Sequence, residues 1–300
     1  MRAGSGLAWV RAPGGRRLVV VQDDASFLAL VEPPDGAVTG VPLPAGPGGA
    51  RQFDARRGTK AHKLDLEACL VLDDGGDEVL LALGSGSTDR RERVVVARGL
   101  GGPAPDVRLV AAPALYALLR AEVAFSGSEL NVEGAARDGD DVVLFQRGNG
   151  AARSGRTPVD ATCRLDARAL LAHLADPRTP PPAPRDVVAW ALGEIDGVRL
   201  TFTDAAPGPG GLRFLAAAED SPDTYDDGHV TGVVVGVLDD DARGRWTPLL
   251  DPGGAPLLDK AEGLALDPDD PGRAWVVIDA DDPDRPADLC EVRLTGPWEL

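Results

Sequence analysis

Cysteine, lysine and long apolar runs are all scarce in this chain of 300 residues. The three cysteines, Cys69, Cys163 and Cys290, are odd in number and lack any C-x-x-C spacing, which supports neither a disulfide framework nor a zinc site. No apolar run approaches the ~20 residues of a membrane span. The N-terminus also lacks the continuous apolar segment of a signal peptide. We therefore expect a cytoplasmic protein with no membrane partner.

Positive charge is in short supply as well. The chain has 31 Lys and Arg residues against 48 Asp and Glu residues, for a net charge of −17. Nucleic-acid binding needs Lys and Arg to displace counterions, so this balance argues against nucleic acid and against anionic membrane surfaces. Small cations or neutral ligands suit the field better. The simpler alternative is that net acidity only keeps the protein soluble, and the balance predicts no particular oligomeric state.

A short phrase recurs along the chain. It reads Leu-Asp-Leu-Glu-Ala-Cys up to residue 69, Leu-Asn-Val-Glu-Gly-Ala up to residue 135 and Lys-Ala-Glu-Gly-Leu-Ala up to residue 265. Glu133 follows Glu67 by 66 residues, and Glu262 follows Glu133 by 129 residues, almost twice that interval. A fixed period of this size indicates a repeat architecture.

Extending the period fills in the missing repeats. One lies near residue 198 and another near residue 4, which gives five units starting near residues 4, 64, 130, 198 and 260. Ser5 replaces the glutamate in the first unit, and a Thr203-Asp204 pair replaces it in the fourth. Each unit also contains a second strand that ends in polar residues. Two series aligned at one period are better evidence than one.

Most apolar segments are short, rich in Val and Leu, and bounded by Gly, Pro and Asp, which is typical of strands and turns. Helices are expected only at Pro113–Leu119 and Ala167–Leu174. Several short strands in each of five units predict an all-β fold, a single β-propeller over residues 1–300. We expect five blades, with six as the alternative, and an irregular β-sandwich as the alternative architecture.

The last unit is short, so we expect an incomplete last blade. Too little chain precedes Ser5 to supply the missing strand. The expectation is therefore a weakly closed last blade or a native start upstream of Met1.

In a propeller blade, the first strand starts and the second strand ends on the same rim of the channel. The two polar series should therefore converge on one mouth. The expected ring contains Asp23, Asp24, Lys63, Asp65, Glu67, Ser85, Asn131, Glu133, Arg147, Asn149, Asp204, Glu219, Asp220, Lys260, Glu262, Asp279 and Asp281.

Converging carboxylates raise one another's pKa unless cations intervene. Lysine and arginine could offset them, a hard cation such as calcium could bind them, or some could stay protonated as general acids. Only three lysines occur beside 28 arginines, and Lys63 and Lys260 lie just ahead of repeated glutamates. This placement indicates that a compact ammonium suits those positions, with chance as the alternative.

These roles divide the ring into three groups. The candidate catalytic residues are Glu67, Glu133 and Glu262. The candidate ligand-binding residues are Lys63, Glu67, Asn131, Glu133, Arg147, Asn149, Glu219, Lys260 and Glu262. The candidate metal ligands are Asp23, Asp24, Asp279 and Asp281. Alternatively, the repeated glutamates only cap backbone amides or brace neighbouring blades.

A family resemblance follows from these phrases together with Gly84-Ser-Gly-Ser-Thr88, Phe145-Gln-Arg-Gly-Asn149 and Glu219-Asp-Ser-Pro222. Over nearly its whole length, the chain resembles an uncharacterised bacterial domain family of unknown function. Its Glu-Gly phrases are similar to those of phytase-like and SdiA-regulated-type propeller domains. The resemblance implies a propeller, with calcium or an esterase-like activity in some relatives. The Asp-rich metal cluster of alkaline phytases is not recognisable here, which argues against phytase activity.

The main hypothesis is a propeller that binds a small ligand or a divalent cation at the acidic mouth of its channel. The first alternative is a metal-assisted hydrolase of a phosphoester, ester or lactone. The second is a protein-interaction scaffold that uses the outer faces of the blades.

Overall fold

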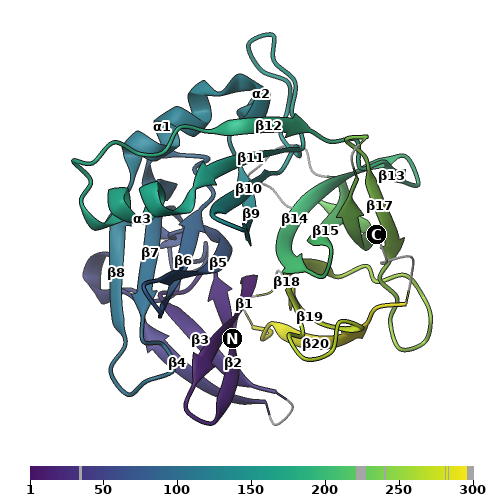
Figure 1. Ribbon diagram of the computed structural model, residues 1–300. Coiled ribbons are helices and arrows are strands. Elements are labelled where there is room, and N and C mark those ends of the chain that lie inside the picture. Colours follow the sequence, from purple (N-terminus) through teal and green to yellow (C-terminus); the bar gives the residue numbers. More distant parts are fainter. Residues whose placement is uncertain (34–35, 221–227, 240, 281, 283, 296–300) are drawn as a thin grey trace.

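The computed structural model describes residues 1–33, 36–220, 228–239, 241–280, 282 and 284–295. Its strands form five separate antiparallel sheets arranged in a ring (Figure 1). The chain is therefore an all-β propeller with five blades. The five-blade prediction is confirmed, and the six-blade alternative is wrong.

Each blade is built from strands that neighbour one another in chain order. The first contains β1 (Gly4–Ala12), β2 (Gly15–Gln22), β3 (Phe27–Glu32) and β4 (Ala37–Pro42). The second contains β5 (Leu66–Asp74), β6 (Asp77–Gly84), β7 (Arg93–Arg98) and β8 (Asp106–Ala111). The third contains β9 (Val132–Asp138), β10 (Asp141–Gln146), β11 (Ala161–Asp166) and β12 (Arg185–Ala189).

The last two blades differ in strand number. The fourth contains β13 (Glu194–Ile195), β14 (Val198–Gly208), β15 (Gly211–Asp220), β16 (His229–Leu238) and β17 (Gly244–Pro248). The fifth contains β18 (Lys260–Leu266), β19 (Arg273–Asp279) and β20 (Asp288–Arg293). Within the described residues the fifth blade thus has three strands, one fewer than the first three, in line with the expected incomplete blade. Its joint with the first blade includes a hydrogen bond from the Ala287 amide to the Met1 carbonyl at 3.2 Å.

The ring is held together by apolar layers between adjacent blades. In β6, Leu80 and Ala82 pack toward the first blade, whereas Leu81 and Leu83 pack toward the third. Side chains alternate across a strand, and here both faces are covered. This explains why the strands read as continuous apolar runs. Burial of such layers, at about 25 cal/mol per Å² of apolar surface, is the main stabilising term of the ring.

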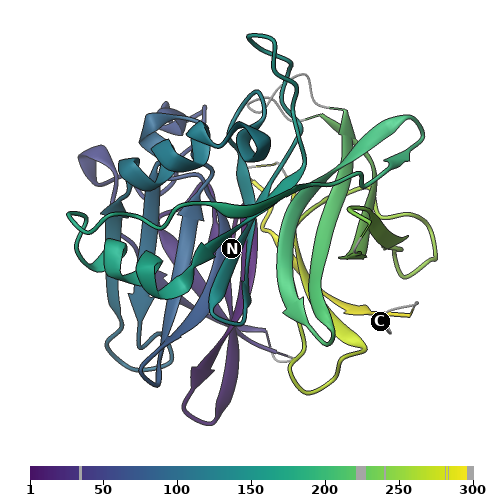
Figure 2. The same cartoon turned by 45° about the horizontal axis from the view of Figure 1, so that its top comes forward.

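Helices are few and lie beside the second and third blades (Figures 1 and 2). Helices α1 (Pro113–Ala121) and α3 (Ala167–Ala175) confirm the two predicted segments, while α2 (Val123–Ser126) was not predicted. Asp166 caps α3 by accepting a hydrogen bond from the Ala169 amide at 2.7 Å. Within the described ranges, no helix combines the length and apolar character needed to cross a membrane.

The innermost strands β1, β5, β9, β14 and β18 contact one another in a closed circle around the channel. Each begins at the same end, because each is the first long strand of its unit. The second strand of each blade ends there as well; Leu66, for example, pairs with Gly84 and Lys260 pairs with Asp279. The two polar series of the sequence therefore meet at one mouth of the channel, as expected.

Candidate cation site at the channel mouth

The repeated phrase marks a β-bulge in every innermost strand. Pairing with the second strand shifts by one residue at five equivalent positions, which are Ser5, Glu67, Glu133, Thr203 and Glu262. A bulge leaves one residue out of the ladder and redirects its side chain. The period in the sequence is thus a period of bulges around the channel.

Two of the five bulge positions brace adjacent blades. The Ser5 hydroxyl donates to the carbonyl of Leu66, and the Thr203 hydroxyl donates to the carbonyl of Ala261 at 2.9 Å. Each accepting residue directly precedes the glutamate of the next blade. The alternative of a bracing role therefore applies to these hydroxyls, whereas the glutamates extend into the mouth.

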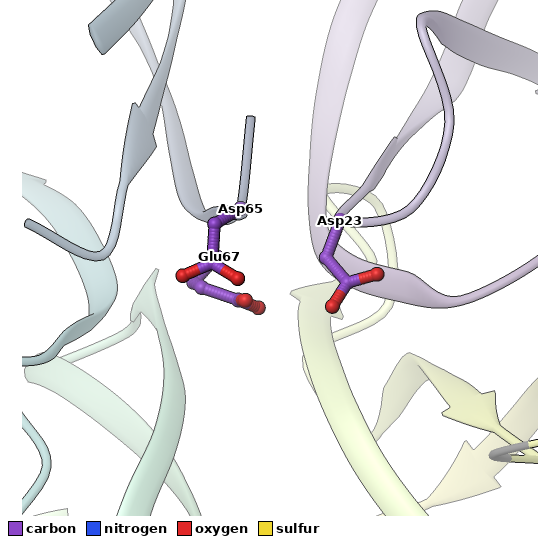
Figure 3. A group of neighbouring side chains, drawn as sticks. All are labelled: Asp23, Asp65 and Glu67. Carbon is purple, nitrogen blue, oxygen red and sulfur yellow. The ribbon is translucent and has the colours of Figure 1, made fainter. Parts of the chain in front are cut away.

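Three carboxylates from the first two blades converge at the mouth (Figure 3). Asp23 follows β2, Asp65 precedes β5, and Glu67 is the bulge residue of β5. One oxygen of each lies within 4.8 Å of the others. Asp65 has a φ of 55°, a left-handed backbone conformation that is uncommon outside glycine and tends to occur at functional sites.

Glu67 stands out within this triad. Its residue is only 8% exposed, and no group among the described residues donates a hydrogen bond to its carboxylate or forms an ion pair with it. Burial, followed by the charges of Asp65, Asp23 and Glu133, raises the pKa of Glu67 well above its usual range. A carboxylate in this position is stabilised by a proton, by water or by an added cation.

Lys63 is the resident counterion of the other two acids. Its ammonium lies 2.7 Å from Asp23 and 2.8 Å from Asp65. Burial opposes its charge, but Asp23, Asp65 and Glu67 together raise the pKa of Lys63 well above its usual value. Asp65 is also 2.9 Å from Arg91. Although burial acts in the opposite direction, Lys63 and Arg91 hold the pKa of Asp65 below its usual range.

The third and fourth blades contribute a second buried network. Arg147, at the end of β10, is 4% exposed and donates to Glu219. It also lies 3.6 Å from Glu133, which accepts a hydrogen bond of 2.6 Å from the side-chain Nδ2 of Asn131. Burial acts to lower the pKa of Arg147, but the charges of Glu133, Glu219 and Glu262 outweigh this effect. The pKa of Arg147 is therefore raised above its usual value. Burial likewise raises the pKa of Glu133.

The fifth blade completes the mouth with Lys260 and Glu262, whose charged atoms are 3.0 Å apart. Burial is the main cause that raises the pKa of Glu262 well above its usual range, although the charge of Lys260 acts to lower it. Among the described residues, the interacting carboxylates outnumber the cations by seven to four. The carboxylates are Asp23, Asp65, Glu67, Glu133, Glu219, Glu262 and Asp279. The cations are Lys63, Arg91, Arg147 and Lys260.

Most of the residues expected in the ring are therefore brought together at the channel mouth. Four of them are not placed there by the structure. Asp24 turns to Arg2, which it contacts at 2.8 Å, and is not part of the triad. Asp220 is exposed at the end of β15. Asp281 lies outside the described residues.

Asp204 is the fourth, and its expected place on the rim is wrong. It sits one residue past the bulge, aligned with Gly6, Gly134 and Gly263, where the inner strands approach most closely. Its carboxylate is fully buried; one oxygen accepts a bond of 2.7 Å from the Leu264 amide, and the other has no hydrogen-bond partner among the described residues. Asp204 thus links β14 to β18 at the waist of the channel.

Arg91 was missed by the sequence analysis. It follows the Gly84-Ser-Gly-Ser-Thr88 segment and donates to Ser87 at 2.7 Å as well as to Asp65. The only available signal was its position shortly after the polar end of a second strand. Because arginines are common in this chain, that signal did not distinguish Arg91 from its neighbours Arg90 and Arg93.

Asp160, behind Arg147, gives a pH-dependent prediction. One of its oxygens accepts from the Gly148 amide at 3.0 Å and the Phe202 amide at 3.1 Å, which joins the third and fourth blades. Burial raises the pKa of Asp160 to about 6. Since the folded state holds the proton more tightly than the unfolded chain, this group's contribution to stability should fall as the pH rises from about 4 to 6.

Asp160→Asn keeps an oxygen for both amides and removes this titration. Urea unfolding from pH 4 to 7 should show the variant gaining stability relative to the parent as the pH rises through this window, by up to about 1.4 kcal/mol per pH unit. A constant difference across the range would contradict the assignment.

Solved structures with propeller folds align with most of this chain at low identity. A PQQ-bound aldose sugar dehydrogenase from Streptomyces coelicolor is 12% identical, with 98% of this chain and 94% of that chain covered and a TM-score of 0.39. A calcium structure of a Trichoderma reesei enzyme of family AA12 is 12% identical, with 92% and 78% covered and a TM-score of 0.33. These likenesses carry no functional argument.

An extracellular domain from B. thetaiotaomicron is 10% identical, with 92% of this chain covered and a TM-score of 0.34. This chain spans only 25% of that protein's chain. A search of curated proteins found no match. A family profile, however, matches residues 1–294, nearly the whole chain. As the sequence resemblance predicted, the chain belongs to a family of unknown function, DUF6929.

Proposed function

We propose that this propeller binds a divalent cation, calcium in the first instance, between Asp23, Asp65 and Glu67. The observation that carries the proposal is Glu67, a buried carboxylate with no hydrogen-bond donor among the described residues, within 4.8 Å of two further carboxylates. Calcium prefers oxygen ligands, and carboxylates can bind it through one or both oxygens. An added cation would supply the positive charge that Glu67 lacks.

The charge balance of the whole mouth supports the same conclusion. Seven interacting carboxylates face four cations among the described residues, so ionising all of them would leave an excess of negative charge in a largely buried setting. In such a setting the attraction for a cation is stronger than at an exposed acidic surface. A neutral or anionic ligand would leave that excess uncompensated.

Lys63 is the internal competitor for this cation. Its ammonium already contacts Asp23 and Asp65, and a calcium ion on the triad would have to displace it. Lys63 also lines an adjoining cavity of about 550 Å³, which gives its flexible side chain room to withdraw. The proposal is therefore an exchange, in which the ammonium and the metal ion alternate on the same carboxylates.

The test uses two neighbouring aspartates as a matched pair. Calcium should raise the unfolding temperature of the parent protein in a saturable way, because a ligand that binds only the folded state stabilises it. Asp23→Asn should weaken the apparent affinity for calcium, read from that shift, at least about tenfold. Asp24→Asn, the same change on the residue that faces Arg2, should leave it nearly unchanged.

Three outcomes of this thermal-shift experiment would reject the proposal. They are no response to calcium, magnesium or manganese, a response that survives Asp23→Asn, and an equal loss in the two variants. The hydrolase and interaction-scaffold hypotheses stay predictions of the sequence.

A further inference from the structure

The channel has a second cavity, the lower cavity, at the end opposite the acidic mouth. Its volume is about 600 Å³, within the range of small-molecule sites. All five innermost strands line it with residues that follow their bulges, such as Leu7, Leu70, Ala135, Ala205 and Leu264. None of the charged residues of the acidic mouth reaches this cavity.

The waist of the channel separates the two ends. An added Cβ at Gly263 would come within 3.1 Å of the Gly6 backbone, and one at Gly134 within 3.1 Å of the Asp204 and Ala205 backbone. Asp204 places a buried carboxylate at the same level, where it accepts a hydrogen bond from the Leu264 amide of β18. Because the lower cavity and the carboxylate triad share no residue, we expect binding at one not to depend on the other.

The walls of the lower cavity are apolar and held in place. The indole of Trp9 donates to the carbonyl of Leu266 at 2.8 Å, which fixes an aromatic wall across the joint between the first and fifth blades. Four of the other lining residues are prolines, whose backbone is already restricted: Pro207, Pro209, Pro268 and Pro271. Such a preformed cavity loses little conformational freedom when a ligand binds.

The charged residues at its rim are unevenly compensated. Glu78 pairs with Arg11 at 2.7 Å, and Asp267 pairs with Arg273 at 2.8 Å. Arg16 and Arg137 also line the cavity; the Nε of Arg137 donates to the Gly139 carbonyl at 3.0 Å, but neither arginine forms an ion pair with any residue the structure describes. In a protein with a net charge of −17, this end of the channel therefore offers uncompensated positive charge.

From this combination we propose that the lower cavity binds a small amphipathic anion, an aryl or alkyl carboxylate whose apolar body lies against Trp9 and Leu70. Its carboxylate would face Arg16 and Arg137, since guanidinium groups bind carboxylates with two parallel hydrogen bonds. The apolar walls provide affinity, and the two arginines select the anionic head group. This site is distinct from the proposed cation site.

Two fluorescent probes of similar shape test the proposal. The anion 8-anilinonaphthalene-1-sulfonate and the neutral N-phenyl-1-naphthylamine both brighten in apolar surroundings. The folded protein should bind one equivalent of the anion, equally well with calcium or with EDTA. The double variant Arg16→Gln/Arg137→Gln should weaken the anion about tenfold and the neutral probe less than about twofold.

Matched variants separate this site from general effects. Arg108→Gln/Arg245→Gln removes the same charge from exposed positions on the outer strands β8 and β17 and should change neither probe. Val71→Trp, at a half-buried lining position, should weaken both probes by filling the cavity. Circular dichroism and thermal unfolding confirm that each variant is folded.

The proposal is overturned if the anionic probe does not bind saturably to the folded protein. It is also overturned if the two double variants weaken that probe equally, or if Val71→Trp leaves both probes unaffected. The arginine positions are exposed, so these variants keep the test valid even if Val71→Trp fails to fold. A missing calcium response would reject the cation site alone.

Discussion

Lys63→Met should destabilise the protein by about 3–5 kcal/mol in EDTA and should make it strongly dependent on calcium for stability. The substitution removes the ammonium that lies 2.7 Å from Asp23 and 2.8 Å from Asp65. Breaking one partner out of a buried ion pair leaves the remaining charges uncompensated, which accounts for the magnitude. Because the competitor for the triad is then gone, calcium should bind more tightly and restore most of the loss.

The measurement is urea unfolding of parent and variant in EDTA and in increasing calcium. Lys260→Met is the matched control, since it removes the other mouth lysine, which pairs with Glu262 of the fifth blade. It should also lose stability, but calcium should restore it no more than it stabilises the parent. If calcium rescues both variants equally, or neither, the exchange between Lys63 and a metal ion is incorrect.

Arg147→Met should produce a loss of similar size, about 3–5 kcal/mol, that calcium does not reverse. Arg147 is 4% exposed and contacts Glu133, Glu219 and the hydroxyl of Thr201, so its removal leaves two buried glutamates without their guanidinium. The pKa of Glu133 is already raised by burial and should rise further. An acid with a raised folded-state pKa stabilises the fold as the pH falls, so the loss should be smaller at pH 5 than at pH 7.5.

Urea unfolding at the two pH values measures this difference. Arg164→Met is the control, because Arg164 is about one-third exposed and pairs with Asp138 at the surface, where an ion pair contributes about 1 kcal/mol or less. Adding Glu219→Gln to Arg147→Met should recover part of the stability by removing one buried charge. A loss below about 1 kcal/mol for Arg147→Met would show that the network does not hold the third and fourth blades together.

The sequence predicted the architecture because propeller blades repeat locally. Each blade needs short apolar strands with both faces covered and a turn between them, and the runs such as Leu80-Leu81-Ala82-Leu83 record that requirement directly. The phrase around Glu67, Glu133 and Glu262 gave the period because the bulge has the same residue type in three of five blades. Antiparallel pairing then placed both polar series at one mouth without further information.

The partners of each side chain could not be predicted in the same way. Asp23 and Asp24 are neighbours in the chain, yet one faces Lys63 and the other Arg2, because successive side chains point in different directions. Thr203 and Asp204 are likewise neighbours, and the bulge alone decides that the carboxylate enters the waist rather than the rim. A shift of one residue in pairing reverses such assignments, and pairing is a property of the folded sheet.

The sequence by itself thus determined an all-β propeller of five units, its acidic character and the chemical types that gather at one mouth. The tertiary structure decided which carboxylates converge, that Glu67 has no hydrogen-bond donor among the described residues, and that a largely apolar cavity, lined by two arginines without an ion pair among those residues, lies beyond the waist. The physical reason is that repeat and strand patterns arise from local burial, whereas a site depends on angstrom-scale distances between blades far apart in the chain.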